Sequence, residues 1–173
     1  MTYIVVPDSV TSIRDRAFYN CTNLKSIVIP NSVTSVGDWA FFNCSSLTSI
    51  VIPDSVTSIG EGVFYQCESL KSIDIPDSVT IIRSSAFRRC SSLTSIVIPD
   101  SVTSIGVDAF SYCYSLTNIT ISDSVKSIGN NAFYNCTNLK RVVFKGKTLK
   151  KVQSMKNYPW DIDTRKTKII AKR

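Results

Sequence analysis

The chain has 173 residues, of which 43% are hydrophobic and 19% are charged, a composition typical of one globular domain with a sizeable core. It contains no run of about 18 apolar residues, which excludes a membrane-spanning helix. It also contains no histidine, which excludes Ser-His-Asp and Cys-His arrangements and histidine metal sites. The net charge of +7 belongs to the tail, since residues 1–144 hold 10 basic and 11 acidic residues, whereas residues 145–173 hold 10 and 2. The near-neutral body gives no reason to expect nucleic-acid binding.

A 23-residue repeat runs through most of the chain. A cysteine, a phenylalanine, a leucine and, in five units, a proline recur at this interval. A unit of this size cannot enclose its own apolar residues and must stack on its neighbours. We therefore expect about six coils in residues 1–144 and a different, capping segment in residues 145–173. The cysteines of the repeat are Cys21, Cys44, Cys67, Cys90, Cys113 and Cys136, which are all the cysteines of the chain.

The first part of each unit predicts a short strand. In the unit that starts at Leu24, Ile27 and Ile29 alternate with outward positions and are β-branched, which suits a pleated surface. Pro30 lacks an N–H group for a ladder, so the strand is expected to end there.

The second part of the unit predicts a further short extended segment and then a turn. Val33 and Val36 mark the extended segment, and Gly37 allows the bend that follows. From Asp38 to Cys44, apolar residues spaced by one and three predict a single helical or 3₁₀ turn.

The whole pattern is L-x-x-I-x-I-P-x-S-V-x-x-I-G-x-x-A-F-x-x-C, as in Leu47 to Cys67 with Val63 in the Ala place. Over residues 3–144 it resembles the BspA-like leucine-rich repeats of bacterial and protist surface proteins. The resemblance implies an α/β solenoid, a right-handed superhelix with a parallel β-sheet on one face and short strands and helical turns elsewhere. Ser32 stands where commoner leucine-rich repeats have Asn or Cys, so we expect Ser, Asp and water to satisfy the turn backbone.

The tail predicts a C-terminal cap made of a short helix and a final strand. Thr148 is a candidate N-cap, and residues 167–171 are expected to form the strand. Such a cap covers the core that the last coil would otherwise expose. The residues expected to pack on this end are Leu149, Val152, Met155, Tyr158, Pro159 and Trp160.

The N-terminal end has no comparable cap in the sequence. Ile4 and Val6 are already in strand register, so the first coil is expected to have an unpaired edge. Our hypothesis is that the chain is an excised fragment, or that further repeats, a cap or a secretion signal precede it in the natural protein. We expect a monomer unless this edge pairs.

The cysteines are expected to be buried, reduced and structural. No C-x-x-C motif is present, and each cysteine occupies the same inward place in its coil. Parallel stacked side chains do not easily meet the ~90° torsion that a disulfide requires. We expect no cofactor and no metal.

Two further polar patterns have ordinary explanations. The aspartates that follow the repeat prolines are turn residues, which we favour over a shared calcium site. Four N-x-S/T sequences match the N-glycosylation acceptor but fit chance in a chain rich in Asn, Ser and Thr. These aspartates are Asp8, Asp54, Asp77 and Asp100, together with Asp123, which follows Ser122 in the place of the proline, and Asn31 holds the second place of the series. The four asparagines are Asn20, Asn43, Asn118 and Asn135.

Two surfaces are candidates for partner binding. The outward positions of the strand side form a small-residue face with a valine line, and the helical-turn side gathers aromatic and arginine side chains. The competing interpretation is that the valines favour strand formation and the aromatics cover coil junctions. The strand-side candidates are Lys25, Val28, Val51, Lys71, Asp74, Val97 and Thr120, and the turn-side candidates are Trp39, Phe42, Tyr65, Arg88, Arg89 and Tyr112.

The family resemblance implies a non-enzymatic, adhesin-like recognition module, on the cell surface or secreted, that binds a protein or glycan partner through the repeat face. The alternative is a cytoplasmic protein-interaction scaffold with the same fold, which the missing signal sequence and the many cysteines favour. An enzyme is not expected, because no constellation of acid, base and nucleophile is visible.

Overall fold

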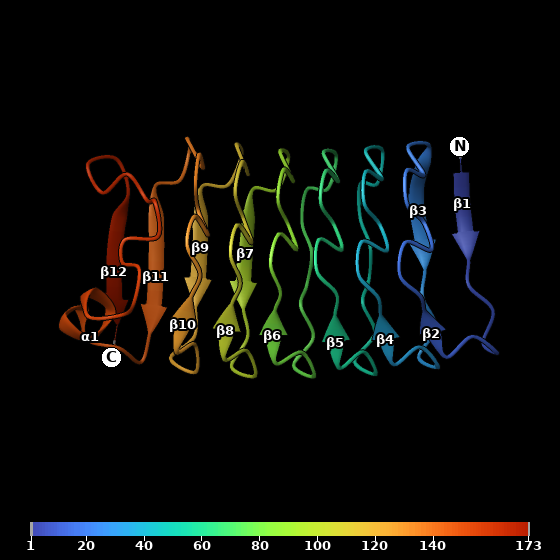
Figure 1. The fold of residues 1–173 in the computed structure, drawn as a ribbon, viewed down its shortest axis with the longest axis horizontal. Coiled ribbons are helices and arrows are strands. Elements are labelled where there is room, and N and C mark those ends of the chain that lie inside the picture. Colours follow the sequence, from blue (N-terminus) through green and yellow to red (C-terminus); the bar gives the residue numbers. More distant parts are fainter. Residues whose placement is uncertain (1, 173) are drawn as a thin grey trace.

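In the computed structural model, which describes residues 2–172, each 23-residue unit forms one coil of a solenoid whose two ends hold the two termini (Figure 1). Two rows of strands run along it, and all strand pairs are parallel. The first row holds β1 (Thr2–Val5), β3 (Leu24–Val28), β7 (Ser95–Ile98), β9 (Asn118–Ile121), β11 (Arg141–Lys145) and β12 (Lys168–Lys172). The second row holds β2 (Ser12–Ile13), β4 (Ser35–Val36), β5 (Ser58–Ile59), β6 (Ile81–Ile82), β8 (Ser104–Ile105) and β10 (Ser127–Ile128).

The core is built from the repeat positions that the sequence indicates. Phe64 and Cys67 are buried, as is Leu70, and their equivalents in the neighbouring coils lie above and below them. The repeat phenylalanines form a continuous stack, with ring centroids 5.1 Å apart at Phe18–Phe41 and 5.7 Å apart at Phe110–Phe133. Because each ring packs between two others, every coil depends on its neighbours for burial.

The turn segments do not contain the helical or 3₁₀ turns that we predicted. Residues 38–44 form consecutive turns in which Trp39 and Asn43 have φ angles of 58° and 54°. A right-handed helix cannot pass through a left-handed residue every fourth position. Alternate N–H groups instead donate to the next coil, and this third ladder comprises Trp39 N to Glu61 O (2.7 Å), Phe41 N to Val63 O (2.9 Å) and Asn43 N to Tyr65 O (2.8 Å).

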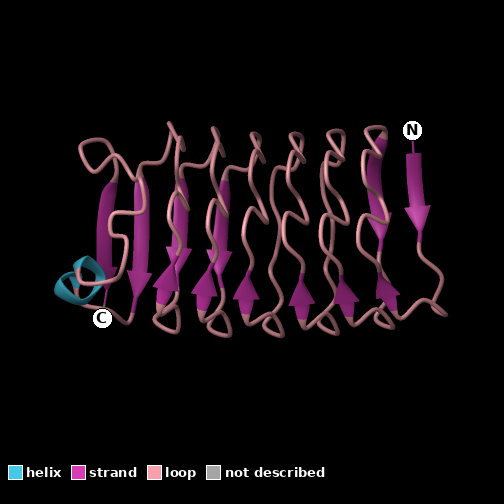
Figure 2. Cartoon of the chain, viewed as in Figure 1, coloured by secondary structure: helices cyan, strands magenta, loops and turns pink. Residues whose placement is uncertain are grey.

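The class is therefore a β-solenoid with little helix, not the α/β solenoid expected. The only helix among residues 2–172 is α1 (Leu149–Gln153), at the C-terminal end (Figure 2). The right-handed sense of the superhelix stays a prediction.

We predicted one parallel sheet along this side of the solenoid, but the first row of strands forms two separate sheets. One sheet contains β1 and β3, and another contains β7, β9, β11 and β12. Between them, residues 47–52 and 70–75 are extended but unpaired along most of their length, each junction keeping a bond such as Thr48 N to Lys25 O (3.2 Å). Residues 47–52 and 93–98 share the sequence LTSIVI, so neighbouring coils, not the segment itself, decide whether a strand pairs.

Glycine at the end of the second-row strand lets consecutive coils approach closely. A Cβ atom added at Gly106 would lie 2.5 Å from the backbone N of Ser84 and 2.6 Å from the carbonyl carbon of Arg83. Both neighbours are backbone atoms, which cannot move aside as the end of a flexible side chain can. Only glycine therefore allows the two coils to approach this closely at residue 106.

Arg83 occupies the same repeat position in the preceding coil, and there the second row is broken. No strand pairing joins β5 to β6, and among the described residues neither Arg83 N nor Thr80 N donates to the preceding coil. At the next junction Gly106 N donates to Ile82 O at 2.8 Å. We attribute the break to the Cβ atom of Arg83, which stands where a close coil contact needs glycine.

Serine and aspartate side chains satisfy part of the turn backbone, as predicted. Ser32 Oγ donates to Val10 O at 2.7 Å, and the equivalent bond recurs at Ser55 and Ser78. The Asp15 carboxylate accepts from the N–H of Asp38 at 2.8 Å. These bonds join each coil to the next outside the strands.

The segment after the last repeat contains α1 and β12, and we interpret it as the C-terminal cap of the solenoid. β12 pairs with β11 in register, and the Thr148 hydroxyl accepts from Lys151 N at 3.3 Å, which confirms the N-cap. Val152 and Trp160 are buried over the last coil. Leu149 was expected to join them but is 46% exposed, because a helix of five residues presents little of its surface to the core.

One lysine of the basic C-terminal tail is buried and not solvated. Lys147 is buried, and its amine donates to the backbone carbonyl of Asp123 in the preceding coil. Burial lowers the pKa of this amine from its ordinary value. Lys147 thus helps to fix the cap on the last repeat.

Candidate functional site

The strand face is defined here as the outward-facing side chains of β1, β3, residues 47–52, residues 70–75, β7 and β9. Strand register places Val5 opposite Val28 and Val97 opposite Thr120. Val28, Val51 and Val97 are 45%, 76% and 60% exposed. The predicted valines therefore lie in one row, which Asp74, exposed, and Thr120, half-buried, interrupt, and Lys25 and Lys71 are exposed beside this row.

The strand face extends further toward the N-terminus than the sequence-derived candidates do. Val5 is 58% exposed and continues the valine line, and Tyr3 is exposed on the same strand. The 23-residue spacing between Val5 and Val28 is the signal that identifies this addition. At the other end the line stops where Val143 is half-buried beside β12.

The turn face is defined here as the side chains that project from the turn segments of the coils. Its N-terminal part is a cluster of rings that cover one another. Tyr19 stacks on Phe42 with centroids 4.5 Å apart, and Phe42 lies 5.2 Å from Tyr65. Trp39 packs against both Phe42 and Tyr65 and covers Gly62 of the next coil. This part fits the interpretation that the aromatics seal coil junctions.

In the next coil, Arg88 occupies the repeat position that Tyr19, Phe42 and Tyr65 hold in the preceding coils. The guanidinium of Arg88 lies 5.5 Å from the ring centroid of Tyr65 and 5.4 Å from that of Tyr112, and it forms an ion pair with Asp108 at 3.2 Å. Arg89 lies 5.3 Å from the ring centroid of Tyr112. All six turn-side candidates are thus brought together along one face.

The cysteines form an internal ladder, and all six are free. The thiol of Cys67 donates to Phe41 O at 3.2 Å, and that of Cys90 donates to Phe64 O at 3.1 Å, a pattern that recurs in each later coil. Burial raises the pKa of Cys44 to about 12 and raises the pKa values of Cys67 and Cys90 well above the ordinary value of a thiol. Thiols protonated at neutral pH are poor nucleophiles, so the ladder is structural. Cys21 and Cys136, at its two ends, are half-buried.

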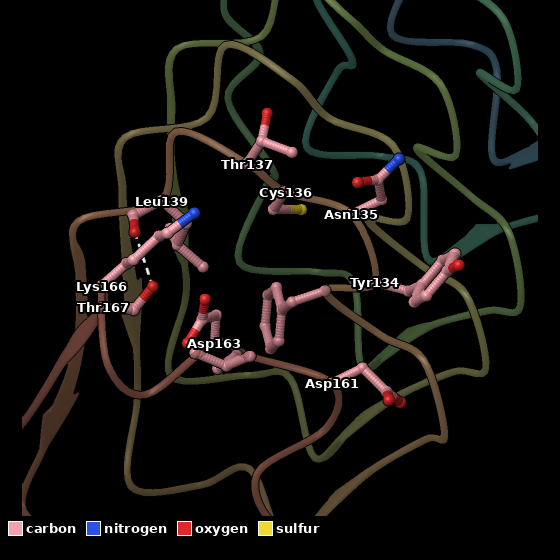
Figure 3. Close-up of a pocket in the computed structure, with 11 residues that line it drawn as sticks. Tyr134, Asn135, Cys136, Thr137, Leu139, Asp161, Asp163, Lys166 and Thr167 are labelled. Carbon is pink, nitrogen blue, oxygen red and sulfur yellow. Dashed lines mark hydrogen bonds between the residues drawn. The ribbon is translucent and has the colours of Figure 1, made fainter.

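A pocket of about 330 Å³ lies between the last repeat coil and the cap (Figure 3). Phe133 and Cys136 come from the coil, and Asp163, Lys166 and Thr167 come from the cap. The sequence did not reveal this pocket, because it forms between two segments whose relative placement no local pattern fixes.

Three of the side chains that line this pocket already have hydrogen-bond partners within the protein. The Thr167 hydroxyl donates to Leu139 O at 2.6 Å, and the Cys136 thiol, whose pKa burial raises to about 12, donates to Phe110 O at 3.0 Å. A hydrogen bond from Arg165 lowers the pKa of Asp163, which keeps this carboxylate ionised. The Cys136 thiol is therefore not an activated nucleophile at neutral pH, and the Asp163 carboxylate is not a general acid there.

Within residues 2–172, no helix has the length and apolar character needed to cross a bilayer. In the same part of the chain, the aspartates that follow the repeat prolines do not gather into a group of three or more metal-ligating side chains. Asp100 accepts a hydrogen bond from Ser122 Oγ at 2.6 Å, which is the behaviour of a turn residue.

Comparison with known proteins identifies the repeats. The model of the BspA type leucine rich repeat region matches residues 1–117 and 59–159, with 6 copies, and this confirms the resemblance indicated by the sequence pattern. No curated protein is significantly similar to the chain.

Three bacterial crystal structures are similar to this chain. A leucine-rich repeat protein from Bacteroides ovatus is 37% identical, with a TM-score of 0.82 over 98% of this chain and 42% of its own. A leucine rich cell surface protein from Faecalibacterium prausnitzii is 36% identical, with a TM-score of 0.65 over 82% and 47%. A leucine-rich repeat protein from Eubacterium ventriosum is 26% identical, with a TM-score of 0.69 over 78% and 43%. The chain spans less than half the length of each of them.

Proposed function

Because this chain belongs to the BspA type leucine-rich repeat family, we propose that it is a non-enzymatic, adhesin-like recognition module that binds a protein partner through the strand face. We place it on the cell surface or outside the cell. One similar structure, that from F. prausnitzii, is described as a cell surface protein, which supports this location.

The observation that carries the proposal is the row of exposed valines on the strand face. Val5, Val28, Val51 and Val97 occupy the same repeat position and are each 45% exposed or more. A line of apolar side chains on an exposed face, interrupted by Asp74 at the same repeat position and with lysines at its margin, is typical of an interaction surface. A protein partner fits better than a glycan, because the valine line is aliphatic and Tyr3, at its N-terminal end, is the one ring among the described residues of this face.

We expect the double substitution Val51→Asp/Val97→Asp to weaken binding to a protein partner by at least about tenfold, since each exposed valine contributes roughly 1 kcal/mol when buried. The measurement is surface plasmon resonance against a panel of purified extracellular matrix proteins, each tested separately. The new carboxylates would flank Asp74, which occupies the same repeat position in the coil between them, so like-charge repulsion is expected to lower the melting temperature, and circular dichroism checks that the fold is retained.

The matched control is Val107→Asp, which changes a valine that is 45% exposed but lies outside the strand face. It should leave binding within about twofold of the wild type. Equal weakening by the control and the double variant would contradict the strand face as the site. Failure of the whole panel to bind would count against a matrix protein as partner.

A further inference from the structure

Two consecutive arginines on the turn face have different roles. Arg88 is held between Tyr65 and Tyr112 and is paired with Asp108, so its charge is satisfied within the protein. Arg89 is exposed and lies over Tyr112, and it forms no ion pair with any described residue. Stacking on a ring restricts the guanidinium without neutralising it. Arg89 is therefore an oriented cation available to a ligand.

The backbone at Arg89 gives no structural reason for arginine. Its φ angle is 59°, a left-handed conformation that Asn tolerates well and that costs a long side chain about 1 kcal/mol. Three of the five equivalent positions hold asparagine, which is what this conformation favours. The equivalent residues are Asn20, Asn43, Gln66, Tyr112 and Asn135.

Arg89 lines a notch of about 330 Å³ together with Glu68, Ser91 and Tyr114. Glu68 is exposed and is not ion-paired with Arg89, so a cation and an anion share the notch without touching. The ring of Tyr114 is 42% exposed. Ser91 Oγ donates to the backbone carbonyl of Glu68 at 3.3 Å, which joins the two coils that form the wall.

Each group in the notch selects one part of a ligand. The Arg89 guanidinium matches a carboxylate, with which it forms two parallel hydrogen bonds. The Glu68 carboxylate accepts hydrogen bonds from hydroxyl groups, and the Tyr114 ring packs on an apolar C–H face. A phosphate dianion would face the charge of Glu68, and a neutral sugar would leave Arg89 without a partner.

We propose that this notch binds an acidic sugar, a pyranose that carries one carboxylate. Arg89 binds the carboxylate, Glu68 accepts from the ring hydroxyls, and Tyr114 stacks on the C–H face of the ring. The site lies on the turn face and is independent of the protein partner proposed for the strand face.

The test is isothermal titration calorimetry of the whole chain with glucuronate and with N-acetylneuraminate, with glucose as the neutral comparison. At least one acidic sugar should bind, and glucose should bind at least about tenfold more weakly. Arg89→Gln should weaken binding of the acidic sugar by at least about tenfold, because it removes the bidentate cation. Tyr114→Ala should weaken it as well.

The matched control is Arg83→Gln, which removes the same charge from an exposed arginine outside the notch. Its affinity for the acidic sugar should stay within about twofold of the wild type. The proposal is overturned if neither acidic sugar binds the wild type, if glucose binds equally well, or if Arg83→Gln weakens binding as much as Arg89→Gln. Circular dichroism melts of each variant show whether the fold is retained.

Discussion

Substituting Gly106 by alanine should destabilise the solenoid by about 3 kcal/mol, the upper end of the usual cost of overpacking. The added Cβ would lie 2.5 Å from Ser84 N and 2.6 Å from the carbonyl carbon of Arg83, and backbone atoms cannot give way without separating the coils. Urea unfolding followed by circular dichroism measures the change. Val107→Ala, at the exposed next residue, should change stability by less than about 0.5 kcal/mol.

The opposite substitution, from arginine to glycine, is expected to stabilise the junction between β5 and β6. Arg83→Gly should let β5 and β6 pair, and two new hydrogen bonds outweigh the entropic cost of glycine by about 1 kcal/mol. Amide hydrogen exchange should slow at residues 80 and 83. Arg14→Gly is the matched control, since no described coil precedes Arg14, and it should not stabilise. If Arg83→Gly leaves exchange unchanged, the arginine does not cause the break.

The cysteine ladder should make the protein unfold at alkaline pH. Cys44, Cys67, Cys90 and Cys113 are fully buried, and burial raises the pKa of each, to about 12 for Cys44. The folded chain therefore keeps protons that the unfolded chain loses above pH ~8.5. Their contribution is intact below that pH and declines as pH rises toward the folded pKa values.

The expected size of this effect is large. Each of these thiols, and Cys136 with them, loses about 1 kcal/mol of stability between pH 8.5 and 9.5, because its unfolded form goes from about half to about nine-tenths ionised, and it loses about 1.4 kcal/mol per pH unit above that. The five thiols together therefore lose roughly 5 kcal/mol over this interval. Urea unfolding under reducing conditions from pH 7 to 10 measures the slope. Cys67→Ser/Cys90→Ser should reduce the slope above pH 9 by about two fifths, whatever its effect on absolute stability. An unchanged slope would show that other groups cause the alkaline loss.

The core and the strand segments of the coils were predictable because one period governs them. When Leu24, Phe41 and Cys44 recur every 23 residues, stacking is the only arrangement that buries all copies. Pro30 ends its strand segment by removing a donor, and Thr148 begins the cap helix by accepting one. These effects act within a few residues of the sequence position that causes them.

The turn segments were mispredicted because apolar spacing does not report the sign of φ. Ala40, Phe41 and Cys44 have the spacing of a helical turn, but Trp39 and Asn43 are left-handed, and the backbone bonds run between coils. A signal was present in the glycine at residue 62 and the asparagines equivalent to Asn43, since both residue types tolerate left-handed backbone.

Features that depend on contacts between coils could not be predicted from one unit. The identical segments 47–52 and 93–98 differ in strand pairing. The different roles of Arg88 and Arg89 depend on where Tyr65, Asp108 and Tyr112 lie, and these residues come from the two coils that flank the arginines. The sequence identified candidate residues on both faces, but it did not show that the charge of Arg88 is paired with Asp108 whereas that of Arg89 has no such partner among the described residues.

Antibody labelling of the repeats tests surface display of this protein most directly. The labelling is done on intact cells of the source organism, in the culture medium and after lysis. We expect antibody signal on intact cells that a brief protease treatment removes, or antibody signal in the culture medium. Signal that appears only after lysis would contradict it, and would identify the solenoid as an intracellular protein-interaction scaffold.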